Sequence, residues 1–207
     1  MIDEQAKARL VSDFPELEDE GMIPQREVFA HFGLLFHGFA LLEHELINIV
    51  TFARQGQDYR AGKLSDEVHW EKSFDRQFDA VKMYSFGNLV EATCKIREYR
   101  EYQSELLDLV GYRNYLAHHF FREDTLLIGD DDGCWKVLLE LDNVRRRVQE
   151  IEVGLRPIFD KMCDRLGMPR PNSTQMDQLI DEMKMEAHEQ WRTEGPSMGW
   201  KPYLKRS

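Results

Sequence analysis

The chain has 207 residues, of which 42% are hydrophobic and 31% are charged, with only 7 prolines and 13 glycines. This composition is typical of one folded globular domain and excludes a low-complexity or intrinsically disordered chain. The formal net charge of -11 excludes a general attraction for nucleic acid, so any RNA contact would need a local basic patch.

No stretch of the chain reaches roughly 18 consecutive apolar residues, the length typical of a membrane span. The N-terminus, MIDEQAKARL, carries acids where a signal peptide has a basic start. We therefore expect a cytoplasmic protein without a membrane segment. The three cysteines are far apart and have no C-x-x-C spacing, which predicts reduced, mostly buried thiols.

The first half of the chain is predicted to form two helices. Apolar residues recur at helical spacing from Pro24 to Arg54, which predicts a long core helix. Residues 55–68 are polar and predict a loop. In residues 71–95, apolar side chains at intervals of three to five predict a second helix, broken near Gly87.

The second half of the chain adds two more core helices. A third helix is expected from about Glu98 to Phe121. A fourth is expected to begin at an N-cap, Asp142 or Asn143, and to end at Gly167 ahead of a proline.

Residues 124–141 separate the third and fourth helices. They contain two short apolar runs on either side of an Asp/Gly turn, GDDDG, which predicts a small hairpin. Three adjacent aspartates could hold a cation, but no complete calcium-loop pattern follows them. We therefore expect no metal and no cofactor.

These elements predict an all-α fold, an up-down bundle of four core helices with a small hairpin insertion near 124–141. Residues 1–172 are predicted to form a single helical domain whose core is 24–167. Residues 173–207 are predicted to form a polar C-terminal helix and a flexible tail.

Two charged residues fall on the predicted apolar faces. On helical wheels, Arg113 lies near the middle of the apolar arc of the third helix, and Glu43 lies close to the centre of the stripe on the first. An unpaired buried charge costs several kcal/mol, so we expect Glu43 and Arg113 to be neighbours. Such a pair could simply fix the register of the two helices, or both groups could open onto a polar cleft.

A histidine and an asparagine accompany this arginine. Asn114 and His118 are four residues apart and so share one helix face, within reach of the long Arg113 side chain. Histidine can act as a general acid or base near neutral pH, and arginine can neutralise a phosphorane. Because RNA carries its own 2′-hydroxyl nucleophile, this trio suits metal-independent RNA cleavage.

The stretch Arg113-Asn114-Tyr115-Leu116-Ala117-His118 resembles the R-[polar]-x-x-x-H signature of the HEPN superfamily. The resemblance covers roughly residues 24–167. It implies a helical bundle that dimerises around a composite cleft, which in many members is a metal-independent endoribonuclease. Arg113 and His118 would then be catalytic, and Asn114 would orient or bind phosphate.

Other residues have weaker roles in this interpretation. Glu43 has no role in the short motif and is assigned a supporting role by the helical-wheel argument alone. His119 fits a looser R-x5-H spacing but points away from His118, so it ranks second. In some toxins of this superfamily a tyrosine two residues after the histidine is modified; here that position is Phe120.

The densest basic cluster, Arg145, Arg146 and Arg147, could grip an RNA backbone or could form the solvated face of the fourth helix. The implied partners are an RNA substrate, a second copy of the chain and an antitoxin protein, the last from the resemblance to toxin and defence components. The alternative function is a non-catalytic interaction, regulatory or nucleotide-binding module of the same fold. The net charge of -11 favours that alternative.

Overall fold

The computed structural model describes residues 23–64 and 66–167, together with isolated positions between 181 and 192. The chain divides between Leu166 and Gly167, and the following account concerns the part before this point. Its described residues form helices and no strand, which confirms the all-α class. The elements are α2 (Ile23–Arg60), α3 (Glu67–Val81), α4 (Phe86–Cys94), the 3₁₀ helix η3 (Arg97–Tyr102), α5 (Gln103–His118), α6 (Phe120–Glu123), α7 (Thr125–Ile128) and α8 (Asp131–Arg165). The predicted C-terminal helix and tail, 173–207, lie outside the described residues apart from those isolated positions.

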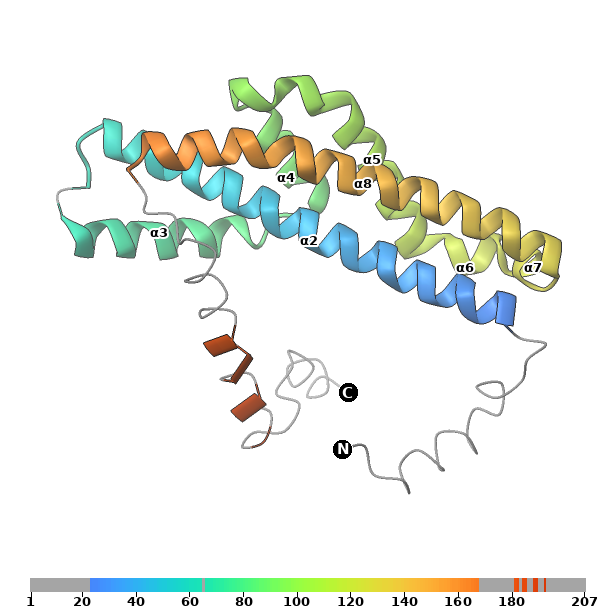
Figure 1. The fold of residues 1–207 in the computed structure, drawn as a ribbon. Helices are drawn as coiled ribbons and strands as arrows, with labels where there is room; N and C mark the ends of the chain where they lie inside the picture. The colour runs from blue at the N-terminus through green and yellow to red at the C-terminus, as the bar shows by residue number, and fades with distance from the viewer. Residues whose placement is uncertain are drawn as a thin grey trace, which may run out of the picture. The chain divides into compact units, whose positions relative to one another are not determined.

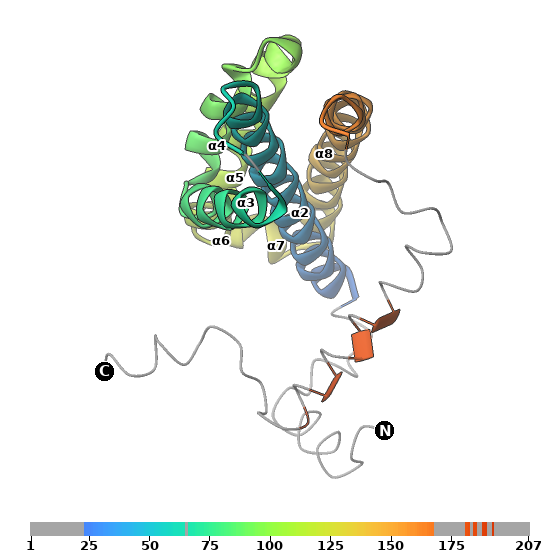
Figure 2. The same cartoon turned by 90° about the vertical axis from the view of Figure 1, so that its left-hand side faces the viewer.

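The two longest helices, α2 and α8, lie side by side and run in the same direction (Figures 1 and 2). Gly38 lies against Val148, and further along both helices the rings of Phe52 and Phe159 meet at 5.4 Å. Residue numbers therefore rise together along the two helices, as a parallel pair requires. We call this contact the α2–α8 seam.

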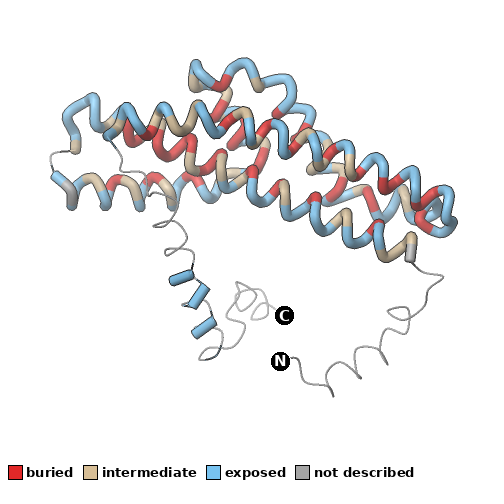
Figure 3. The backbone as a smooth tube through the Cα atoms, in the orientation of Figure 1, coloured by how far each residue is buried: buried red, intermediate tan, exposed pale blue. Residues whose placement is uncertain are grey.

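The seam follows a heptad-like pattern on both helices. Buried apolar residues recur at spacings of three and four, with one spacing of seven at the start of α2, so one stripe of each helix faces the other. On α2 the stripe is Val28, Leu35, Phe39, Leu42, Leu46 and Ile49, and on α8 it is Cys134, Val137, Leu141, Val144, Val148, Ile151 and Leu155. The residues outside these stripes are mostly exposed or half-buried (Figure 3).

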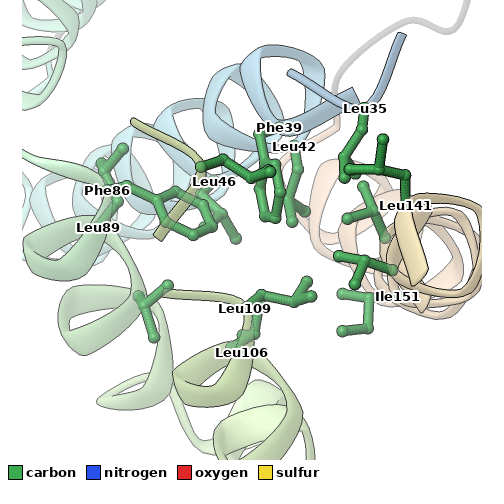
Figure 4. Close-up of a cluster of buried hydrophobic side chains, with 14 of the residues drawn as sticks. Leu35, Phe39, Leu42, Leu46, Phe86, Leu89, Leu106, Leu109, Leu141 and Ile151 are labelled. Atoms are coloured by element: carbon green, nitrogen blue, oxygen red, sulfur yellow. The ribbon is translucent and has the colours of Figure 1, made fainter. Parts of the chain in front are cut away.

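The remaining helices complete the core beside the seam. α4 and α5 supply Phe86, Leu89, Leu106 and Leu109, whose side chains meet those of α2 and α8 in Figure 4. α3 packs on the C-terminal half of α2, where Phe52 contacts Phe74 with ring centroids at 5.2 Å.

The expected up-down order of four helices is not confirmed. In an up-down bundle of four, the first and last helices run antiparallel, whereas α2 and α8 run parallel here (Figure 1). The predicted second helix, 71–95, is divided into α3 and α4, and the segment predicted as the third helix begins with η3 before α5.

The predicted hairpin near 124–141 is wrong, because these residues form α7 and the first turns of α8. The carboxylate of Asp130 accepts a hydrogen bond from the backbone N–H of Gly133 at 3.0 Å, so the aspartates begin a helix. Asp131 and Asp132 occupy the first turn, where negative charge favours the helix dipole. The GDDDG sequence is therefore an N-cap.

Helix boundaries also differ from those predicted. α8 begins before Asp142, which lies inside the helix and is therefore no cap. The second predicted helix breaks just before Gly87, where the Ser85 hydroxyl caps α4 by accepting from the N–H of Asn88. The end of α8 agrees with the prediction, since Gly167 adopts a left-handed φ of 66° one residue beyond the cap.

The segment Pro24–Arg60 is long and apolar enough to cross a membrane, judged by length and composition only. Core helices of soluble bundles have the same properties, and α2 packs against α8, α3 and α4. We assign it no membrane span, and a cytoplasmic location stays a prediction.

The close approach of α7 to α8 yields a stability test. A Cβ added at Gly133 would lie 2.0 Å from the backbone carbonyl oxygen of Leu127. We therefore expect Gly133→Ala to lower the free energy of unfolding by about 2 kcal/mol, a typical cost of overpacking, in urea denaturation. Gly111→Ala is the matched control, because a Cβ at this exposed position of α5 meets nothing within 4 Å. The control should raise stability by about 0.5–1 kcal/mol through helix propensity. Equal effects of the two substitutions would contradict the packing.

Candidate functional site

Arg113 lies on the buried stripe of α5. Four residues before it is Leu109, three after it is Leu116, and both leucines are buried. The arginine itself is half-buried. The helical-wheel position of Arg113 is therefore confirmed.

Asn114 and His118 are exposed on α5, and their spacing of four residues places them on one helix face. His118 is the last residue of α5, and His119 follows outside the helix with φ -124°. The three motif residues thus lie in the C-terminal half of one helix, two exposed on its surface and one half-buried on its packed stripe.

The motif side chains are not engaged elsewhere. In the described part of the chain, Arg113, Asn114 and His118 form no side-chain hydrogen bond and no ion pair. The guanidinium of Arg113 is therefore available to donate hydrogen bonds to an anion.

The expected pairing of Glu43 with Arg113 is not confirmed, since no ion pair or hydrogen bond joins them among the described residues. The helical wheel places Phe29 and Phe36 on the apolar stripe of the first helix, and this part of the prediction is wrong. Phe29 and Phe36 are 49% and 40% exposed, whereas Val28 and Leu35 are buried. α2 accordingly turns toward α8, and its contact with α5 is short.

The acid on α2 with a perturbed ionisation is Glu45, two residues after Glu43. Burial raises the pKa of Glu45, the Arg156 guanidinium opposes that shift, and the Glu152 carboxylate adds to it. Burial also raises the pKa of Glu152. These groups lie along the α2–α8 seam, so they belong to the packing of that seam and not to the motif on α5.

The side chain of His119 is held by contacts with neighbouring residues of the same chain. Its Nδ1 lies 2.9 Å from Oε1 of Glu123 and 2.8 Å from Nη2 of Arg122, and its ring stacks on Tyr115 at 6.2 Å. These contacts fix the turn between α5 and α6 and hold the His119 ring against Tyr115.

Tyr115, inside the motif, anchors the same turn. Its hydroxyl donates a hydrogen bond of 2.5 Å to Oδ2 of Asp124. Burial raises the pKa of the Tyr115 phenol, and the bond to Asp124 raises it further, so the group is held neutral as a donor. The sequence does not predict this contact, because Asp124 is nine residues after Tyr115, whereas helical periodicity relates residues three or four apart.

Exposed aromatic side chains adjoin the end of the motif. Phe121 is 47% exposed and its ring lies 5.9 Å from Phe29 and 4.7 Å from Phe32. Phe36 stacks on Phe32 at 5.9 Å. We call Phe29, Phe32, Phe36 and Phe121 the aromatic face. Clustered exposed aromatics of this kind are typical of protein interfaces.

The arginine cluster 145–147, which could bind an RNA backbone, forms ion pairs with acids of the same chain. Asp142 accepts from Arg145 and from Arg146, each at 2.7 Å. Arg147 pairs with Asp108 of α5 at 3.1 Å and lies over the ring of Tyr112, which ties α8 to α5. The cluster is therefore largely neutralised within the chain.

Several cations without a carboxylate partner among the described residues gather at the other end of the bundle instead. They are Arg54, Arg60, Arg97 and Lys161. They are scattered over three segments of the sequence, so no local run of basic residues could reveal them.

The cysteines and acids form no metal site in the part of the chain that the structure describes, where no three metal-ligating side chains converge. No disulfide joins Cys94, Cys134 and Cys163, and the last two are buried. Comparison with models of known protein families, with curated proteins and with solved structures finds no match to this chain.

Proposed function

We propose that the protein is a metal-independent endoribonuclease whose Arg113 and His118 act at a cleft between two copies of the chain. The observation that carries the proposal is the accessible, unpaired state of the motif: an exposed His118 and Asn114 beside a half-buried Arg113, none engaged by another described residue. The resemblance of residues 113–118 to the HEPN signature supplies the reaction class.

Each motif residue has a chemical role in this reaction. The imidazole of His118 takes the proton of the RNA 2′-hydroxyl, whose oxygen forms a bond to the adjacent phosphorus. The Arg113 guanidinium neutralises the charge of the phosphorane, and Asn114 binds a phosphate oxygen. The bond from phosphorus to the 5′-oxygen then breaks, leaving a 2′,3′-cyclic phosphate and a 5′-hydroxyl.

The leaving 5′-oxygen needs a proton, and a second copy of the chain can supply it. A dimer would bring a second His118 to the cleft, one imidazole acting as base and the other as acid. The aromatic face supports this arrangement, because Phe121 follows His118 by three residues and its exposed ring extends the motif end of α5 toward Phe29. Burial of such a face provides the driving force for association.

A second function of a different class is a non-catalytic interaction or nucleotide-binding module. The net charge of -11 and the pairing of Arg145, Arg146 and Arg147 with acids favour it over a protein that must bind RNA. A toxin or defence role in the cytoplasm, with an antitoxin partner, follows from the resemblance only and forms part of the first proposal.

RNA cleavage tests the catalytic residues. We expect the purified protein to cleave single-stranded RNA in the presence of EDTA, and His118→Ala and Arg113→Ala each to lower the rate about 100-fold or more, the usual worth of general acid–base or charge stabilisation. The products should carry 2′,3′-cyclic phosphates.

The matched controls are on α3, away from the motif. His69→Ala and Arg76→Ala remove the same side-chain types from exposed positions and should retain the wild-type rate. Cleavage that is equal in all variants, or absent in wild type, would reject the nuclease and leave the binding module.

The oligomeric state tests the proposed cleft. We expect the wild type to sediment as a dimer and Phe36→Asp to sediment as a monomer, because the charge would be buried at the interface. Met83→Asp, at another exposed apolar position with 79% exposure, is the control and should stay dimeric. Circular dichroism checks that both variants fold. A monomeric wild type would remove the basis for a shared cleft.

A further inference from the structure

A large groove lies at the end of the bundle opposite the motif. It has a volume of about 980 Å³ and is formed by the C-terminal parts of α2 and α8 together with α4 and η3. This volume is at the upper end of the range for small-molecule sites, which is roughly 300–1,000 Å³. Phe32, beside the motif, and Arg54, in the groove wall, are separated along α2 by roughly 33 Å at 1.5 Å per residue. The groove is therefore a separate site.

The groove is positively charged on a protein that is strongly negative. Six cations and two carboxylates line it, an excess of four positive charges, whereas the whole chain carries -11. The cations are Arg54, Arg60, Lys95, Arg97, Lys161 and Arg165, and the carboxylates are Glu91 and Glu98. Such a reversal of sign in a concave surface focuses the field on an anionic ligand.

Both carboxylates of the groove are already paired. Lys95 binds Glu91 at 2.8 Å, and Arg165 binds Glu98 at 3.2 Å. Among the described residues the other four cations have no acid partner. Arg54 donates to the Tyr84 hydroxyl at 2.8 Å, which leaves its charge uncompensated. Four uncompensated charges match the charge of a ligand with several adjacent phosphates.

Aromatic side chains also line the groove. Tyr59 is 57% exposed, and the half-buried ring of Tyr84 lies 5.4 Å under the Arg54 guanidinium. Tyr99 belongs to the same lining, is 1% exposed, and has a buried hydroxyl without a hydrogen-bond partner in the described part of the chain. The exposed ring of Tyr59 beside these cations can stack on a planar group next to phosphates.

We propose that this groove binds a small ligand with adjacent phosphate groups and a planar ring, the chemistry of a nucleoside polyphosphate. Arg60, Arg97 and Lys161 would hold the phosphates, and Tyr59 would stack on the ring. The proposal does not rest on the ribonuclease activity, because none of these residues belongs to the α5 motif.

Calorimetric titration of the full chain in EDTA tests the proposal with three probes: ATP, inorganic triphosphate and adenosine. We expect ATP to bind best, triphosphate to bind more weakly, and adenosine to show no detectable binding. Higher salt should weaken ATP binding, since the contacts are ionic. Equal affinities for ATP and triphosphate would overturn the role of the ring, and no binding of either would overturn the site.

Charge-neutralising variants locate the binding. Arg97→Gln combined with Lys161→Gln should weaken ATP binding about tenfold or more, because two charge-assisted contacts are lost. The control, Lys72→Gln combined with Arg76→Gln, removes the same net charge from exposed positions of α3 outside the groove and should leave affinity unchanged. Equal losses in both variants would overturn the assignment.

Two further outcomes separate this site from the proposed nuclease. His118→Ala should lower the rate of RNA cleavage about 100-fold or more and retain ATP binding in the groove. If a short single-stranded RNA binds and loses affinity in the Arg97/Lys161 variant while ATP and triphosphate do not bind, the groove is an RNA surface and the small-ligand proposal is wrong.

Discussion

The parallel contact of α2 with α8 is the constraint on which the rest of the structure depends. Each helix contributes a stripe of buried apolar residues at mostly alternating spacings of three and four, and the two stripes meet along the helices. Burying this apolar surface provides the dominant stabilisation of the described bundle. Because two adjacent parallel helices need a long connection, the chain between them is free to form α3, α4, η3 and α5 around the seam.

This arrangement separates two surfaces of different chemistry. At one end, α5 presents Arg113, Asn114 and His118 next to an aromatic face, a surface suited to association and to a reaction between copies. At the other end, the last turns of α2 and α8 approach α4 and η3 and enclose a basic groove. Because the chain as a whole is acidic, it can bind phosphate only where cations gather locally. The basic groove is such a place.

The sequence predicted the helical class, the long first helix and the position of Arg113 on a buried stripe, because each depends on local periodicity. It misassigned GDDDG, because an Asp/Gly turn between apolar runs is typical of a hairpin as well as of an N-cap. The helical wheel also misplaced the α2 stripe, because it assigns phenylalanines to the buried face by residue type alone. In the structure Phe29 and Phe36 are exposed. Two features could not be predicted from periodicity, because they join residues far apart in the sequence. They are the ion pair of Arg147 with Asp108 and the gathering of cations in the groove.

The direction of α8 relative to α2 is the most direct test of this account. Spin labels can be placed at three exposed positions, with Glu27→Cys paired first with Trp135→Cys and then with Arg165→Cys, in a Cys94→Ser background. The parallel seam predicts a short distance from 27 to 135 and a much longer one from 27 to 165, since these two α8 positions are roughly 45 Å apart along the helix. The reverse order of distances in pulsed electron paramagnetic resonance would mean an antiparallel pair and would contradict the fold on which both proposed sites are built.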